Sequence, residues 1–167
     1  MENRALNDHE AYMRLALALA REAAADGEVP VGAVIVRNGE VIGTGRNRRE
    51  KGHNALAHAE LEAIDAACRR LGGWRLSGCT LYVTLEPCPM CAGAAINARL
   101  DRVVQGAADP KAGSCGSLTD LFTVPYNHHP ALIRGVLEPE CREELQRFFR
   151  DLRGRLRRCP QTTDEDG

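Results

Sequence analysis

Apolar residues recur every three to four positions over the first part of the chain, which is the spacing of one face of an α-helix. This face is formed by Met13, Leu15, Ala16, Leu19, Ala20 and Ala23. Asn7 or Asp8 is suited to cap the start of the helix, and Gly27 is suited to end it. The pattern therefore predicts a first helix between these positions.

Two short apolar segments follow, residues 29–36 and 40–45, and they flank Asn38-Gly39. Both central residues of a type I′ turn need positive φ, and Asn-Gly meets this requirement best. We expect an antiparallel hairpin here.

Helical and strand patterns alternate in the rest of the chain. Helical spacing returns over residues 57–71 and is stopped by Gly72-Gly73, while the continuous apolar run 79–85 predicts a buried strand. The same reasoning predicts a helix over 89–98, strands over 101–107 and 131–137, and a last helix opened by Pro139. The apolar stripe of that helix is Cys141, Leu145, Phe148, Phe149, Leu152 and Leu156. This alternation favours an α/β fold whose sheet has parallel members and helices on its faces.

Length and composition are those of one globular domain. The chain has 167 residues, of which 44% are hydrophobic and 27% charged. We expect a single domain over residues 1–158 and a disordered tail over 159–167. The segments 109–120 and 124–130 are rich in glycine, serine or proline and are expected to be loops.

Seven cysteines would suit a secreted disulfide framework, but Met1 is followed by Glu2 and Arg4 without an apolar leader. We therefore expect a reducing, cytoplasmic compartment. No run approaches the ~20 apolar residues needed to span a bilayer, so no membrane association is expected.

The net charge of −1 does not by itself indicate a polyanionic partner. Arginine is nevertheless concentrated in residues 147–158, where six arginines accompany one aspartate. This segment is either a solvated helix face or a phosphate-binding surface.

The sequence PCPMC at 87–91 places two thiols three positions apart at a predicted helix start. On a first helical turn Cys88 and Cys91 lie on the same side, and the helix N-terminus stabilises the thiolates that bind a metal. The pair is a candidate for half of a zinc site. A redox pair and two small buried hydrophobic residues are the alternatives.

The remaining ligands indicate an incomplete site. The chain has no second C-x-x-C and no H-x-x-x-H, whereas His58 opens the second predicted helix and is followed by Glu60. His58, Cys88 and Cys91 would leave a fourth zinc position for water, as in catalytic sites, and Glu60 could take and return a proton. If Glu60 were the fourth ligand, the site would be closed and structural.

HAE at 58–60, followed by PCPMC at 87–91, matches the H-x-E…P-C-x-x-C signature of zinc-dependent nucleobase deaminases. The segments GEVPVGAVIV, GRN, AHAELEAI, TLYVTLEPCPMCAGA, RVVQGA and GSLTDL occur in an order that resembles bacterial tRNA-specific adenosine deaminases, over about residues 9–153.

The resemblance implies a cytidine deaminase-like three-layer α-β-α sandwich with a five-stranded mixed sheet, assembled as a homodimer. It implies one Zn²⁺ per subunit, bound by His58, Cys88 and Cys91, with Glu60 as proton shuttle. It also implies that Asn47 bonds the base, that Ala59, Pro30 and Val31 form pocket wall, and that Asp109 and Asn127 meet the flanking nucleotides. The implied reaction is hydrolysis of adenosine to inosine at the wobble position of a tRNA anticodon stem-loop.

Other functions stay open at this point. The same signature serves deaminases of free guanine, cytosine or cytidine, and a closed site would suit a zinc-stabilised RNA-binding module. Arg46, Arg48, Arg49 and Lys51 beside Asn47 could contact RNA phosphates. The loops at 52–57 and 122–130, and Cys115, depart from the pattern of the family.

Overall fold

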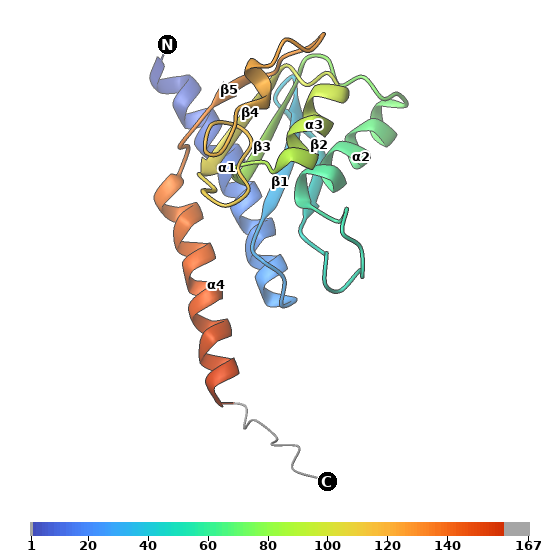
Figure 1. The fold of residues 1–167 in the computed structure, drawn as a ribbon. Coiled ribbons are helices and arrows are strands. Elements are labelled where there is room, and N and C mark those ends of the chain that lie inside the picture. Colours follow the sequence, from blue (N-terminus) through green and yellow to red (C-terminus); the bar gives the residue numbers. More distant parts are fainter. Residues whose placement is uncertain (1, 159–167) are drawn as a thin grey trace.

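The computed structural model describes residues 2–158, with side chains from Asp8 onward, and its centre is one five-stranded sheet (Figure 1). The strand order is β2-β1-β3-β4-β5. The strands are β1 (Gly32–Arg37), β2 (Glu40–Arg46), β3 (Cys79–Leu85), β4 (Arg102–Ala107) and β5 (Ala131–Ile133). The predicted tail at 159–167 lies outside the described residues.

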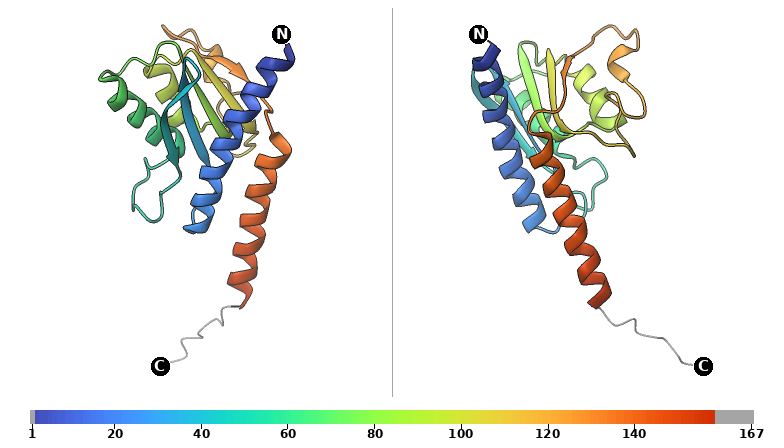
Figure 2. Two further views of the ribbon diagram at one scale, coloured as in Figure 1. Left: turned by 180° about the vertical axis from the view of Figure 1, so that it is seen from behind. Right: turned by 90° about the vertical axis from the view of Figure 1, so that its left-hand side faces the viewer.

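Helices cover both faces of this sheet (Figures 1 and 2). One face carries α1 (Glu2–Ala25) and α4 (Glu138–Arg158), and the other carries α2 (Ala59–Leu71) and α3 (Pro89–Asn97). A short 3₁₀ turn, η1 (Leu121–Thr123), precedes β5. The predicted three-layer α/β architecture is confirmed. Across residues 2–158, no helix combines the length and apolar character needed to cross a bilayer.

The hairpin and the parallel strands form as predicted. Asn38 and Gly39 have φ values of 51° and 80°, as a type I′ turn requires, and β1 pairs antiparallel with both β2 and β3. β3, β4 and β5 are parallel. Because parallel strands end at the same edge, the residues after Leu85 and Ala107 lie close together.

Two element boundaries differ from the prediction by four residues or more. α1 already begins at Glu2, so Asn7 and Asp8 lie inside the helix; the chain has no glycine or proline before Gly27 that would break it. The fifth strand ends at Ile133 rather than 137, because Gly135 and Leu137 adopt positive φ (77° and 52°) and leave the extended conformation.

The apolar stripe of α4 is buried only in its first half. Cys141 and Phe148 are buried, whereas Phe149 is 40% exposed and Leu156 68% exposed. The reason is visible in Figure 2, where the last turns of α4 run past the end of the sheet. The predicted stripe is therefore a packing face near the sheet and a solvent-exposed surface beyond it.

Glycines let α2 lie directly on β2. A Cβ atom at Gly45 would stand 2.1 Å from the Ala59 carbonyl oxygen, and one at Gly43 would stand 2.3 Å from that of Ala63. Both separations are too short for any side chain. The start of α2, with His58 and Glu60, is thus held against the sheet by a contact that only glycine permits.

Replacing Gly45 by alanine should lower the free energy of unfolding by about 2–3 kcal/mol, because the new methyl group must displace helix backbone. Urea titration followed by circular dichroism measures the loss. Gly73→Ala is the matched control, since a Cβ there meets nothing within 4 Å and the position does not need positive φ. Equal stability of the two variants would contradict this account of the packing.

Candidate active site

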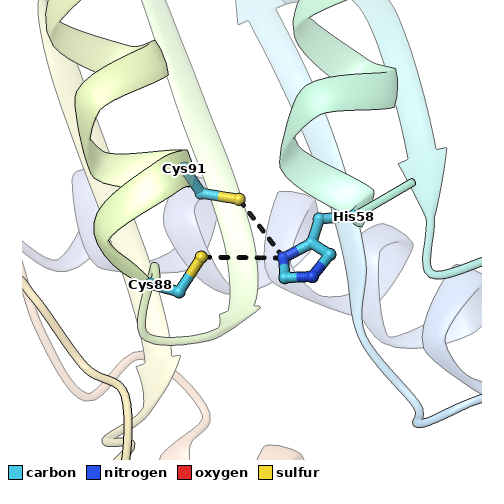
Figure 3. A group of neighbouring side chains, drawn as sticks. All are labelled: His58, Cys88 and Cys91. Carbon is cyan, nitrogen blue, oxygen red and sulfur yellow. Dashed lines mark hydrogen bonds between the residues drawn. The ribbon is translucent and has the colours of Figure 1, made fainter. Parts of the chain in front are cut away.

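His58, Cys88 and Cys91 converge where α2 and α3 begin (Figure 3). His58 is the residue before α2, and Cys88 is the residue before α3, whose first position is Pro89. His58 Nδ1 lies 3.7 Å from Cys88 Sγ and 3.5 Å from Cys91 Sγ. All three potential ligand atoms lie within 4.8 Å of one another. Two segments about 30 residues apart in sequence thus form one cluster.

The cluster has the dimensions of a zinc site. With bonds of about 2.3 Å to sulfur and 2.05 Å to nitrogen, a tetrahedral zinc ion separates an imidazole nitrogen from a thiolate by about 3.6 Å. The observed nitrogen–sulfur distances are 3.5 and 3.7 Å. One nitrogen and two sulfurs also form a donor set that zinc prefers. These residues fit the ion.

The local electrostatics favour a thiolate at Cys88. A hydrogen bond with the Cys91 thiol, and a second with His58, lower the pKa of Cys88 to about 4. The same pairing with Cys88, together with burial, raises the pKa of Cys91. The hydrogen bond with Cys88 raises the pKa of His58. Negative charge is therefore concentrated on Cys88, at the positive end of α3.

Glu60 is the second residue of α2 and is 4% exposed. Burial raises the pKa of its carboxyl group to about 7. A group with this pKa can both accept and donate a proton near neutral pH.

The cluster opens onto a pocket of about 200 Å³. Of the residues predicted from sequence, the pocket is lined by His58, Cys88, Glu60, Asn47, Ala59, Val31 and Asp109. Cys91 is buried in the first turn of α3. Pro30 is buried but does not line the pocket, whereas its neighbours Val29 and Val31 do. Asn127 is exposed and lies outside the lining, in the segment between η1 and β5.

Asn47 is held in a fixed orientation at the pocket. Its Nδ2 donates to the Val29 carbonyl oxygen at 3.3 Å, and its Oδ1 accepts from the Arg49 backbone N–H at 3.1 Å. Because an amide nitrogen carries two hydrogens, one of them is left for a bound group.

Sequence reasoning missed several pocket residues, namely Val29, Leu85, Glu86 and Ala112, and it treated Arg49 only as an RNA contact. It also missed the buried Glu28, which accepts hydrogen bonds from the Glu50 and Lys51 backbone N–H groups. The sequence did contain one signal that could have pointed to the two glutamates. Glu28 and Glu86 are both charged residues set beside apolar strand-forming runs.

The basic residues near the site are partly neutralised. Arg46 pairs with Glu22 and Asp26, Arg48 with Glu62, and Lys51 with Asp26. A second groove beside the 109–113 turn is lined by Lys111, Arg142, Leu145, Gln146, Phe149, Arg150 and Arg153.

Comparisons with known proteins place the chain among deaminases. The family model described as MafB19-like deaminase matches residues 7–153. A tRNA-specific adenosine deaminase from Bacillus subtilis is 48% identical over 161 residues, covering 96% of this chain and all of the relative. One from Agrobacterium fabrum is 47% identical, covering 85% of this chain and 94% of the relative. A solved structure from work on A-to-I editing by tRNA:A34 deaminases has a TM-score of 0.78 and 46% identity, covering 81% and 99% of the two chains.

The electrostatics predict a selective reactivity in chelator-treated protein. A thiol whose pKa is lowered is already ionised at pH 6, so alkylation of Cys88 by iodoacetamide should change little between pH 6 and pH 8. Cys68 is the control, because it is also only partly buried and burial raises its pKa. Its rate should rise about tenfold per pH unit. Peptide mass spectrometry follows both sites, and parallel pH profiles would refute the prediction.

Proposed function

The chain belongs to the MafB19-like deaminase family, and we propose that it is a tRNA-specific adenosine deaminase. It hydrolyses the wobble adenosine of a tRNA anticodon to inosine and releases ammonia. The observation that carries this conclusion is the His58–Cys88–Cys91 cluster with buried Glu60 at one pocket, in a chain nearly half identical to enzymes of that name. The proposed deaminase domain spans residues 1–158.

His58, Cys88 and Cys91 would hold one Zn²⁺ per subunit. When bound, the ion supplies Lewis-acid chemistry that makes water a nucleophile at neutral pH. The support for this assignment is the match of distances and donor types described above.

Glu60 would manage the protons of the reaction. Its carboxylate takes one proton from water and delivers it to N1 of the adenine ring as C6 is attacked. It then takes the proton of the new C6 hydroxyl group and passes it to the departing amine, which leaves as ammonia. Its burial supports this role, because a carboxyl group with a pKa near 7 exchanges protons readily at physiological pH.

Asn47, Ala59 and Val31 would hold the base, with the second hydrogen of Asn47 Nδ2 available to a ring nitrogen. Asp109 lies at the same pocket and would meet a flanking nucleotide. Asn127 lies outside the pocket, so we propose contact with a more distant nucleotide. Pro30 is buried between Val29 and Val31 and would fix the positions of these two wall residues without touching the base.

The surroundings suit RNA better than a free base. Arg49 lines the pocket, and the groove with Lys111 and the α4 arginines starts at the loop that carries Asp109. An RNA strand entering the pocket would place its phosphates near these cations. We propose, from the family resemblance, that the enzyme is a homodimer and acts in the cytoplasm.

Glu60→Gln should keep the fold and the zinc but lower turnover by about 10²–10⁴-fold, because the amide cannot carry protons. Inosine in an anticodon stem-loop is measured by mass spectrometry, and zinc by plasma emission. Retained activity, or loss of zinc, would make Glu60 something other than a proton shuttle.

Cys88→Ser and Cys68→Ser form a matched pair for the metal assignment. The first should lose zinc and activity, because it removes a thiolate ligand. The second should keep both, since Cys68 only approaches the Trp74 carbonyl oxygen. Equal zinc content in the two variants would contradict the assignment.

The substrate class is tested with zinc-loaded protein, an anticodon stem-loop with adenosine at the wobble position, and free adenosine, guanine and cytosine. We expect inosine in the RNA only, with binding that weakens by about tenfold or more between 50 and 200 mM salt. Product from a free base, with none from RNA, would replace the proposed function by free-base deamination.

A further inference from the structure

One wall of the pocket is a loop that regular secondary structure does not hold. Residues 109–120 contribute Asp109 and Ala112 to the lining, yet they form turns and only one isolated bridge, between Cys115 and Asp120. If a loop that lines an active site moves freely, the enzyme binds its substrate more weakly. Backbone bonds hold part of the segment, among them one from the Ser114 N–H to the Pro87 carbonyl oxygen at 2.9 Å, and buried side chains must supply further support.

Glu86 supplies that support. Its Oε1 accepts from the backbone N–H groups of Cys115 at 3.0 Å and Ser117 at 2.9 Å. Its Oε2 accepts from the backbone N–H of Asp109 at 2.9 Å and from the Ser117 hydroxyl group. The carboxylate thus joins both ends of the segment 109–117.

These four bonds use the full capacity of the group. A carboxylate has about four lone-pair positions, and Glu86 fills two on each oxygen. Although Glu86 lines the pocket and is 2% exposed, its oxygens are not available to a substrate without release of the loop. This separates its role from that of Glu60.

The loop also packs directly on the carboxylate. A Cβ atom at Gly113 would lie 2.4 Å from Glu86 Cδ and Oε2, and 2.4 Å from the Asp109 carbonyl oxygen. In addition, the Glu86 backbone N–H donates to the Ala107 carbonyl oxygen at 2.8 Å, which fixes Glu86 to the end of β4. Glu86 is therefore fixed to the sheet through its backbone, and its carboxylate holds the loop through hydrogen bonds.

We propose that Glu86 is a positioning residue that fixes the 109–117 loop and so sets how the pocket grips the RNA around the target base. This rests on the proposed function. Glu86 takes no part in proton transfer; its effect reaches the substrate through Asp109 and Ala112.

Glu28 offers a control of the same kind at the opposite wall. It is 1% exposed, and its oxygens accept from the backbone N–H groups of Lys51 at 2.7 Å and Glu50 at 3.2 Å. That loop carries Asn47 and Arg49 to the pocket. Removing either carboxylate should loosen only its own loop.

The experiment compares zinc-loaded wild type, Glu86→Gln, Ser117→Ala and Glu28→Gln. Amide hydrogen exchange is measured by NMR at residues 50, 51, 109, 115 and 117, and KM and kcat are measured on the anticodon stem-loop. In Glu86→Gln one of the two oxygens is replaced by an –NH₂ that cannot accept, so exchange should rise by about tenfold or more at 109, or at 115 and 117, depending on which oxygen is replaced. KM should rise about tenfold while kcat changes less.

Ser117→Ala, which removes one bond from Glu86 and keeps the carboxylate, should shift exchange and KM in the same direction by about threefold. Glu28→Gln should raise exchange at 50 or at 51, whichever donor loses its oxygen, and leave 109, 115 and 117 unchanged. If Glu86→Gln does not fold, the exchange rates and KM of Ser117→Ala alone test the proposal.

Unchanged exchange and KM in the folded variants would overturn the proposal. A fall in kcat alone, with the loop still protected, would also overturn it and make Glu86 a catalytic residue. The exchange measurement needs no RNA. If wild type fails to deaminate the stem-loop, the proposed function fails, while the exchange rates still decide whether Glu86 holds the loop.

Discussion

The active site depends on the contact between α2 and β2, where helix backbone lies against Gly43 and Gly45. His58 and Glu60 sit at the first turn of α2, so their positions follow the helix as a body. Cys88 and Cys91 are fixed in the same way by the end of β3 and the first turn of α3. The ligands therefore meet because two helices are packed on one sheet, and an ion arriving there meets a preformed cluster.

Local sequence patterns were sufficient to predict much of the fold. The Asn38-Gly39 turn, the buried run 79–85 and the glycine stop of α2 are decided by residues within a few positions of one another, and each was predicted correctly. The grouping of His58 with Cys88 and Cys91 needed the recognised signature as well. The exposed second half of the α4 stripe and the early end of β5 were not readable, because both depend on where neighbouring elements stop.

Three of the buried glutamates, those near the pocket, show what sequence reasoning could not predict. Glu28, Glu60 and Glu86 are each almost wholly buried, but their surroundings give them different tasks. Glu86 is saturated by donors 23 to 31 residues away, whereas Glu28 accepts from two donors 22 and 23 residues away. Glu60 is left beside His58 and Cys91 with a raised pKa. Of the three, only Glu60 belongs to the H-x-E…P-C-x-x-C signature, so only its role was predicted.

The overhang of α4 has a consequence for the dynamics of the protein. From Phe149 to Arg158 every side chain is solvent-exposed apart from the partly covered Gly154, and so few tertiary contacts stabilise these turns. A helical segment of this length is only marginally stable without such contacts. The end of α4 can therefore unwind and re-form without disturbing the sheet, so its arginines can search a wider volume around the protein than a rigidly docked helix would allow.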